Sequence, residues 1–402
     1  MKLNLINYCQ SAQAISEALS KKGGEIRFVG GCVRDALLGM AIDDIDFATD
    51  LPPNLVIAAL NRAEIKVIPT GLKHGTVTAI VDKNTYEITT LRCDTKCDGR
   101  HAEIKFTDSW EEDAARRDLT FNALYCDLES NLYDYFSGVQ DLENKLIRFV
   151  GDTEERIRED YLRMLRAFRF YAYIPGTVLD SEIVRACSKF ASNVNSLSGE
   201  RIRQEMMKLL QCPNLMNALK AMSETGLLSY VMPGELHLDS LSALLSIRNI
   251  SNLKKIIDPL LRLAVIADHS HCTYIIKRWK LSNKEKKTLL TLTDDEVSNK
   301  VLAGDSDLAE KLGKELYCKV LLLNLAKGKI SAGRYEELIS FIQSYVEFPI
   351  KGRDLLQAGM KPGKEIGKIL ELLRERWESS NFELSKEELL NYVRNIRHSS
   401  FE

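Results

Sequence analysis

The feature that most constrains this chain is the stretch FVGGCVRDALLGMAIDDIDFATD at residues 28–50. An apolar strand-like run leads into Gly30 and Gly31, a helical segment follows, and then come Asp44 and Asp46. Because glycine has no Cβ atom, the backbone amides at such a helix start can closely approach an anion. A glycine pair or an Asp-x-Asp is common by itself, but this order and spacing predict a phosphate cradle beside a metal site.

The two aspartates are predicted to occupy one strand, because strand alternation sends Asp44 and Asp46 to the same face. Carboxylate oxygens are the ligands that Mg²⁺ prefers, and such a pair is typical of metal-assisted phosphoryl chemistry. Glu87, on a later β-rich run, is the candidate third acid, although the sequence leaves that assignment open. Arg34, one helical turn after the glycines, can add a charge-assisted contact to a triphosphate.

The predicted secondary structure changes after the first 150 residues. The β-rich runs IRFVG, TVTAIV and YEITTL lie within residues 25–150, whereas helical periodicity dominates from about residue 152 onward. The predicted fold class is therefore α+β, with a small mixed α/β head followed by an all-α neck, body and tail. The expected parts are a head over residues 1–150, a neck over 151–212, a helical body over 213–348 and a helical tail over 349–402.

Composition says more about the cellular compartment of the protein than about its function. A formal net charge of −2 over 402 residues gives no global signature of a polyanion binder, so any RNA contact must come from local lysine and arginine clusters. Nine scattered cysteines indicate a reducing compartment with mostly buried thiols. No stretch has the length and apolar character of a membrane span, and we expect a cytoplasmic protein without membrane contact.

The pattern GG-x-V-R-D, followed nine residues after Asp35 by D-I-D-F-A-T, resembles the polymerase β-like nucleotidyltransferase superfamily. Within it, the chain resembles class II tRNA nucleotidyltransferases and bacterial poly(A) polymerases. The block EEDAARRDLTFNALYCD is similar to the family's second block, which implies that Arg116 and Arg117 contact nucleotide phosphates and that Asn122 helps to fix the site. Residues 198–209 are similar to the neck helix that supports the nucleotide pocket in this family.

The segment REDYLRMLRAFRF resembles the family's E-D-x-x-R motif. On a continuous helix, Asp160 and Arg163 would lie one turn apart and present an acceptor beside a forked donor. Cytosine and adenine both offer an amino donor beside an unprotonated ring nitrogen, so this pair would accept C and A and reject U and G. We expect Glu159 to orient Arg163, and Arg166 and Arg169 resemble positions that meet the triphosphate.

The resemblance covers about half of the chain and implies a template-independent enzyme that adds C, C and A from CTP and ATP to the 3′ end of tRNA, with Mg²⁺ as cofactor. The polar segment between Arg92 and Asp113 is similar to the flexible loop by which CCA-adding members switch from C to A. The alternatives are a CC-adding, A-adding or poly(A)-forming member, or a catalytically silent RNA-binding protein. The oligomeric state stays open.

Two groups of histidine and cysteine residues have spacings that partly resemble functional sites. Cys93, Cys97 and His101 have a loosely metal-like spacing but lack a fourth ligand, so a zinc site is not expected. His269 and His271 lack the separated His, His-Asp and Asp pattern of a phosphohydrolase, so no hydrolase domain is expected.

Overall fold

The computed structural model describes residue 5 and residues 11–97, 102–247, 256–344, 348–380 and 383–399. The chain forms two units, which are described separately below. The first unit comprises residues 1–236 and 273–283, and the second comprises residues 237–272 and 284–402.

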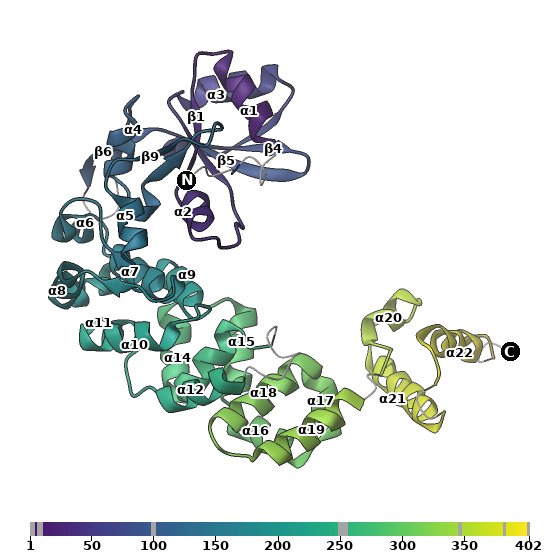
Figure 1. Ribbon diagram of the computed structural model, residues 1–402. Helices are drawn as coiled ribbons and strands as arrows, with labels where there is room; N and C mark the ends of the chain where they lie inside the picture. The colour runs from purple at the N-terminus through teal and green to yellow at the C-terminus, as the bar shows by residue number, and fades with distance from the viewer. Residues whose placement is uncertain are drawn as a thin grey trace. The chain divides into compact units, whose positions relative to one another are not determined.

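A seven-stranded mixed sheet forms the centre of the head, in the order β3-β4-β5-β2-β1-β8-β9 (Figure 1). Strands β2 and β5 run parallel, and every other neighbouring pair in this sheet is antiparallel. The strands are β1 (Ile26–Val29), β2 (Asp46–Thr49), β3 (Lys66–Gly71), β4 (Thr76–Val81), β5 (Asn84–Thr90), β8 (Leu124–Cys126) and β9 (Leu132–Asp134).

Apolar side chains of the central strands hold this sheet against its helices. All four residues of β1 are buried, and the rings of Phe28 and Phe47 lie 4.9 Å apart between neighbouring strands. Helix α2 (Gly31–Leu37) packs on β1 and β8, whereas α3 (Pro53–Arg62) packs on β3, β4 and α1 (Ala12–Ser20). The glycine pair therefore lies at a junction whose position is fixed by buried strands.

The polar segment predicted as a loop is largely a β-hairpin. Strands β6 (Arg92–Cys97) and β7 (Ala102–Phe106) form an antiparallel two-stranded sheet, and the tip lies outside the described residues. The other short elements of the head are the turns η2 (Leu72–His74) and η3 (Thr120–Asn122), the helices α4 (Trp110–Ala115) and α5 (Gly138–Glu143), and β10 (Leu146–Ile147), which pairs with β11 (Val178–Leu179).

The rest of the first unit is almost entirely helical. Helix α7 packs against α9 and α10, and the fully buried Trp279 donates its indole N–H to the Val231 carbonyl at 3.1 Å. The elements are α6 (Thr153–Glu159), α7 (Leu162–Tyr173), α8 (Ser181–Phe190), η4 (Ala191–Ser196), α9 (Gly199–Leu209), α10 (Leu215–Glu224) and α11 (Leu227–Val231).

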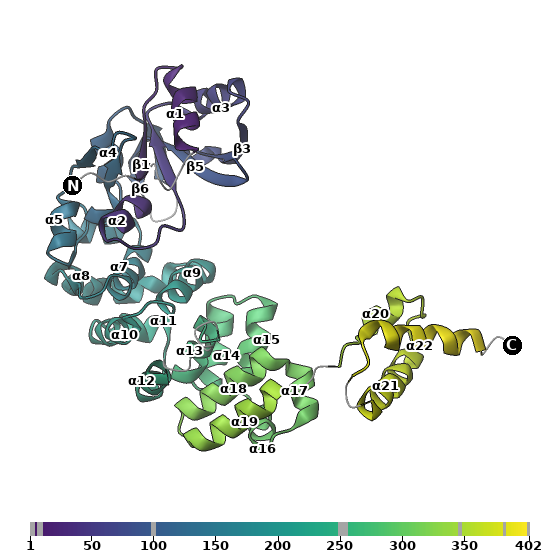
Figure 2. The same cartoon turned by 45° about the vertical axis from the view of Figure 1, so that its right-hand side comes forward.

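The described part of the second unit consists of helices. Helix α18, buried along most of its length, packs against α12, α13, α16, α17 and α19 (Figure 2). The helices are α12 (Leu238–Ser246), α13 (Pro259–Ile266), α14 (His269–Arg278), which begins in this unit and ends in the first, α15 (Asn283–Leu292), α16 (Asp295–Ala303), α17 (Ser306–Leu312), α18 (Lys314–Ala326), α19 (Ala332–Ser344), α20 (Gly352–Gln357), α21 (Lys364–Ser379) and α22 (Lys386–Ser399).

The last three helices have a hydrophobic cluster of their own, formed by Phe348, Ile350, Leu355, Leu373, Trp377, Leu389 and Val393. None of the described helices combines the length and the apolar character needed to cross a membrane. A mixed-sheet head followed by helices confirms the predicted fold class.

Candidate active site

The glycine pair begins helix α2 directly after strand β1. Gly30 has φ +73° and ψ −117°, a conformation that side-chain-bearing residues rarely adopt, and it caps the helix. A Cβ atom at Gly30 would lie 3.5 Å from Arg117 Nη1 and 3.5 Å from the Asn122 carbonyl oxygen. A Cβ atom at Gly31 would lie 3.7 Å from Arg34 Nη2. The glycine pair therefore lies close to Arg34, Arg117 and Asn122, all of which were predicted as site residues.

The carboxylates meet where β2 lies parallel to β5. Asp46 is the first residue of β2 and is in register with Glu87 on β5. The prediction that one strand carries both aspartates is wrong, because Asp44 is exposed and precedes the strand by two residues. The pKa of Asp46 is raised to about 6 by burial and by the charges of Glu87 and Asp44, although Arg117 opposes this.

These acids form a concentration of negative charge, but not a closed ligand cage. Among the described residues, no three aspartate, glutamate, histidine or cysteine side chains are already arranged as a metal-binding group. The donor chemistry nevertheless fits Mg²⁺, because hard carboxylate oxygens that repel one another are stabilised when a cation binds between them.

Asp113 holds the predicted arginine pair. Arg116 donates to its Oδ1 at 2.6 Å, and Arg117 donates to its Oδ2 at 3.0 Å. Burial would raise the pKa of Asp113, but the charges of Arg117 and Arg116 outweigh it and lower the pKa to about 2. Arg117 also donates to the Tyr125 hydroxyl through Nε, while its Nη1 lies beside Gly30.

Arg34 is buried next to the glycine pair and does not lie on the surface of the protein. It is 7% exposed and donates to both carboxylate oxygens of Asp35, at 2.9 and 2.7 Å. A third bond, 2.7 Å long, goes from Nη1 to the Asn122 Oδ1, and the Asn122 amide donates to Asp118 at 3.1 Å. Arg34 and Asn122 therefore form a buried support for the turn.

The predicted continuous helix through the E-D-x-x-R motif is wrong. Helix α6 ends at Glu159, Asp160 has an extended backbone with φ −156° and ψ 104°, and α7 begins at Leu162. Asp160 Oδ1 accepts the Leu162 N–H at 3.1 Å, and its Oδ2 accepts a 2.6 Å bond from Arg201 on α9. Asp160 thus pairs with Arg201 and not with Arg163.

Arg163 is fixed by three acceptors of its own. Its Nη1 donates to Glu159 at 2.5 Å and to the Arg156 carbonyl at 3.0 Å, and its Nη2 donates to the Arg116 carbonyl at 3.0 Å. The ion pair with Glu159 is the contact expected if Glu159 orients this guanidinium. The bond to Arg116 ties α7 to the segment that carries the phosphate-binding candidates.

Two buried acids that the sequence analysis did not single out hold the remaining arginines. Asp118 accepts from Arg166 at 2.5 Å, and Glu205 accepts from Arg169 at 2.6 Å. Burial would raise the pKa of Asp118, but the charge of Arg166 lowers it well below its usual range. Since Asp118 also binds Asn122, a polar chain runs from the glycine turn to α9.

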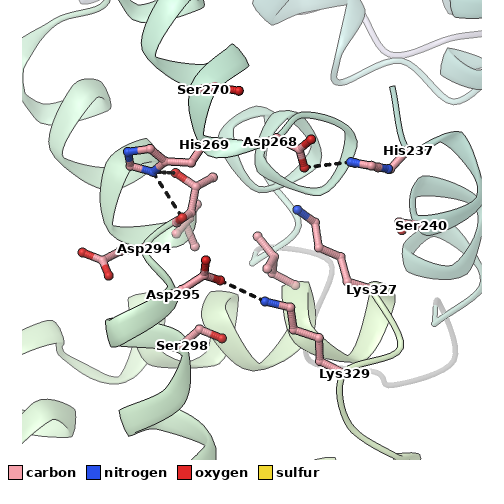
Figure 3. A pocket seen from close by; sticks show the side chains of 13 residues that line it. His237, Ser240, Asp268, His269, Ser270, Asp294, Asp295, Ser298, Lys327 and Lys329 are labelled. Carbon is pink, nitrogen blue, oxygen red and sulfur yellow. Dashed lines mark hydrogen bonds and ion pairs between the residues drawn. The ribbon is translucent and has the colours of Figure 1, made fainter. Parts of the chain in front are cut away.

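A polar cavity lies elsewhere, within the second unit. A cavity of about 560 Å³ is lined by residues from α12, α14, α16 and α18 and by adjoining residues (Figure 3). His237 contacts Asp268 at 2.8 Å, Lys329 contacts Asp295 at 3.1 Å, and Lys327 points toward Asp268. Its acids and bases largely neutralise one another, and it contains none of the predicted site residues.

Two family models of known proteins match parts of this chain. Residues 26–148 match the family model described as the poly A polymerase head domain, and residues 178–236 match one described as a probable RNA and SrmB-binding site of polymerase A.

Similar proteins extend the match over nearly the whole chain. The mitochondrial CCA tRNA nucleotidyltransferase 1 of Mus musculus is 34% identical over 96% of this chain and 90% of its own. A CCA-adding enzyme of Ligilactobacillus salivarius is 32% identical over 98% of both. The crystal structure of the Bacillus stearothermophilus CCA-adding enzyme in complex with CTP has a TM-score of 0.70 and 28% identity, covering 100% of this chain and 99% of that one. On this identity and coverage, the chain belongs to the family of CCA-adding tRNA nucleotidyltransferases.

Proposed function

We propose that this protein completes the 3′ end of tRNA by adding C, C and A from CTP and ATP without a nucleic-acid template. The observation that carries the proposal is the meeting of Asp46, Glu87 and Arg117 beside the Gly30 turn, in a chain that matches CCA-adding enzymes along its length. Acidic groups for a metal therefore lie next to cationic and amide groups for a triphosphate.

We propose that Asp44 and Asp46 hold Mg²⁺, with Glu87 as the third acid. Bound Mg²⁺ would supply positive charge that activates the attacking 3′-hydroxyl and stabilises the departing pyrophosphate. Arg117 and the amides at Gly30 and Gly31 would bind the triphosphate.

The other residues predicted to bind nucleotide would surround this metal and triphosphate site. Arg116, held in place by Asp113, would bind the phosphates. The buried Arg34 and Asn122 would keep the glycine turn in place. Arg166 and Arg169 would add positive charge toward the triphosphate from α7.

For base selection we propose Asp160 as the acceptor for the exocyclic amino group and Arg163 as the donor to the ring nitrogen. Uracil and guanine would place a carbonyl against the Asp160 carboxylate and a ring N–H against Arg163, so both protein groups would be left unpaired. Mismatches of this kind are rejected by factors on the order of 10⁴. Glu159 would support the selection by holding Arg163.

The deciding experiment offers tRNA that ends before CCA, or after CC, with CTP and ATP singly and together. We expect two C residues from CTP alone, one A on the CC-ending substrate, and a completed CCA end from both nucleotides. Addition that stops after CC would identify a CC-adding enzyme, and a run of A residues would identify a poly(A) polymerase. Binding of tRNA without any incorporation would indicate a silent RNA-binding protein.

For the organisation of the chain we propose the four parts 1–150, 151–212, 213–348 and 349–402, with tRNA along the body and tail. The separate hydrophobic cluster of the last helices supports a distinct tail. We also propose a cytoplasmic or equivalent reducing setting, because the seven cysteines whose side chains the structure describes are all free and six are buried.

A further inference from the structure

The Asp160 carboxylate is held from two sides. Its Oδ1 accepts the Leu162 N–H at 3.1 Å, and its Oδ2 accepts the Arg201 guanidinium at 2.6 Å. Asp160 lies between two helices in extended backbone, so no helical turn restrains its side chain. Arg201 comes from α9, 41 residues further along the chain, and makes the ion pair that fixes this carboxylate.

Arg201 itself projects from a helix start whose position is tightly defined. A Cβ atom at Gly199 would lie 2.2 Å from the Arg278 carbonyl oxygen, so the two backbones are in close contact. Arg278 donates to the Leu197 carbonyl at 3.2 Å, and Lys280 pairs with Glu200 at 2.7 Å. The chain is therefore anchored over the residues just before Arg201, at the start of α9.

We propose that Arg201 is a positioning residue for nucleotide selection, which fixes the Asp160 carboxylate in the orientation that accepts the amino group of cytosine or adenine. This inference rests on the proposed function of Asp160. A carboxylate has about four acceptor positions, so the bonds from Arg201 and Leu162 leave room for the base. Both side chains are partly solvent-accessible, at 28% for Asp160 and 38% for Arg201, which leaves the pair open to a ligand.

Loss of Arg201 removes one of the two restraints on Asp160. The carboxylate can then rotate about its side-chain torsions, and correct nucleotides lose an aligned acceptor, whereas UTP and GTP had no favourable contact to lose. A hydrogen bond to a charged group contributes about 1.5–3 kcal/mol, which corresponds to about 10-fold to 100-fold in rate. Selectivity falls by this factor when Arg201 is removed.

The test measures kcat and KM for all four nucleotides on tRNA lacking CCA and on tRNA ending in CC. In Arg201→Ala, kcat/KM for CTP and ATP falls about 10-fold to 100-fold while that for UTP and GTP changes little. Arg201→Lys restores part of the CTP-to-UTP ratio. Lys208→Ala, which removes an exposed cation from the same helix, leaves the ratio unchanged.

A purely structural role gives a different result. Partial unfolding lowers incorporation of all four nucleotides equally, so an unchanged CTP-to-UTP ratio in Arg201→Ala overturns the proposal. If Arg201→Ala does not fold, Arg201→Gln is measured in its place. In an Asp160→Ala background, Arg201→Ala has no further effect on the ratio, and an additive loss there also contradicts the proposal. If the wild-type protein shows no preference for C and A, the proposed function itself fails.

Discussion

At the scale of single residues, Asp113 accepts several hydrogen bonds within the described part of the head. Its Oδ1 accepts from Arg116 and from the backbone N–H of Arg92, and its Oδ2 accepts from Arg117 and from the Tyr125 hydroxyl at 2.7 Å. One buried carboxylate therefore fixes both arginines proposed for the triphosphate, and also the residue that begins the β6–β7 hairpin.

Replacement of Asp113 by Asn should reduce stability in a pH-dependent manner. The folded pKa of about 2 lies below the ordinary value of 3.8, so the ionised carboxylate stabilises the fold above about pH 4 and this contribution is lost as the pH falls toward 2. The shift corresponds to about 2 kcal/mol, so the free energy of unfolding at pH 7 should drop by about that amount.

Urea unfolding of wild type and Asp113→Asn from pH 7 to pH 2 measures this effect. The difference between the two proteins should shrink below about pH 4, because protonation removes the same charge from the wild type. Asp108→Asn, at an exposed position of the same segment, should show no such difference. A constant difference across the whole pH range would rule out the ionic role.

The metal assignment predicts that Asp44→Ala loses nucleotide incorporation by roughly 10³-fold, because a lost metal contribution of several kcal/mol raises the barrier accordingly. Asp44 is exposed and outside the strand, so the circular dichroism spectrum and tRNA affinity should stay close to wild type. The neighbouring exposed Asp43→Ala is the matched control and should retain activity. Equal activity of the two variants would remove Asp44 from the metal site.

The sequence predicted the cationic side of the site better than its anionic side. Glycines and arginines in a recognisable order identify the phosphate groups, but the acids that hold the arginines come from other elements. Asp118 and Glu205 each pair with an arginine far away in the chain. Local signals existed for Asp113, three and four residues before the arginine pair, and for Glu159, four residues before Arg163, because these are the spacings of helical ion pairs.

At the scale of elements, the break at Asp160 shows where periodicity misleads. Helical spacing of apolar residues continues through residues 156–172, so the pattern favoured one helix. Asp160 instead bonds the Leu162 N–H at the start of α7, and aspartate commonly satisfies free amides at helix starts. The strands over residues 26–29, 76–81 and 84–90 were predicted well, because each is a short run of β-forming residues with turn residues on either side.

The β6–β7 hairpin is the element on which product length should depend. Its first residue, Arg92, donates its N–H to Asp113 and accepts a 3.1 Å bond from Arg116, so the hairpin is linked directly to the arginine pair. Replacing residues 94–105 with Asn-Gly should leave C addition intact and lower A addition to tRNA ending in CC by roughly 10²-fold, the effect of misplaced reacting groups.

Single-nucleotide incorporation assays separate the two steps. The control variant replaces Asp82-Lys83, the turn between β4 and β5, with Asn-Gly; both residues have positive φ, at 51° and 66°, which Asn and Gly tolerate. This control should retain both steps. Equal loss of C and A addition in the hairpin variant would show that the hairpin supports the head as a whole and does not govern the last step.

At the scale of the whole molecule, a net charge of −2 gives the protein no overall positive charge with which to attract tRNA. Binding must depend on local contacts, and the C-terminal part presents exposed cations such as Arg353 on α20 and Lys361 between α20 and α21. The cluster from Phe348 to Val393 gives these helices a core separate from the head. Deletion of residues 348–402 should therefore leave the head folded and the KM for CTP unchanged, while the KM for tRNA rises.

The salt dependence of tRNA binding makes this prediction quantitative. The slope of log affinity against log salt falls by about 0.7–0.9 for each phosphate contact removed, so the truncated protein should have a shallower slope than the full chain. Arg353→Ala and Lys361→Ala, which keep the tail, should each reduce the slope by less than one. Glu365→Gln, which removes a negative charge from the same tail, should not make the slope shallower. Identical slopes for the truncated and full-length proteins would mean that the tail makes no phosphate contact and that the body alone binds tRNA.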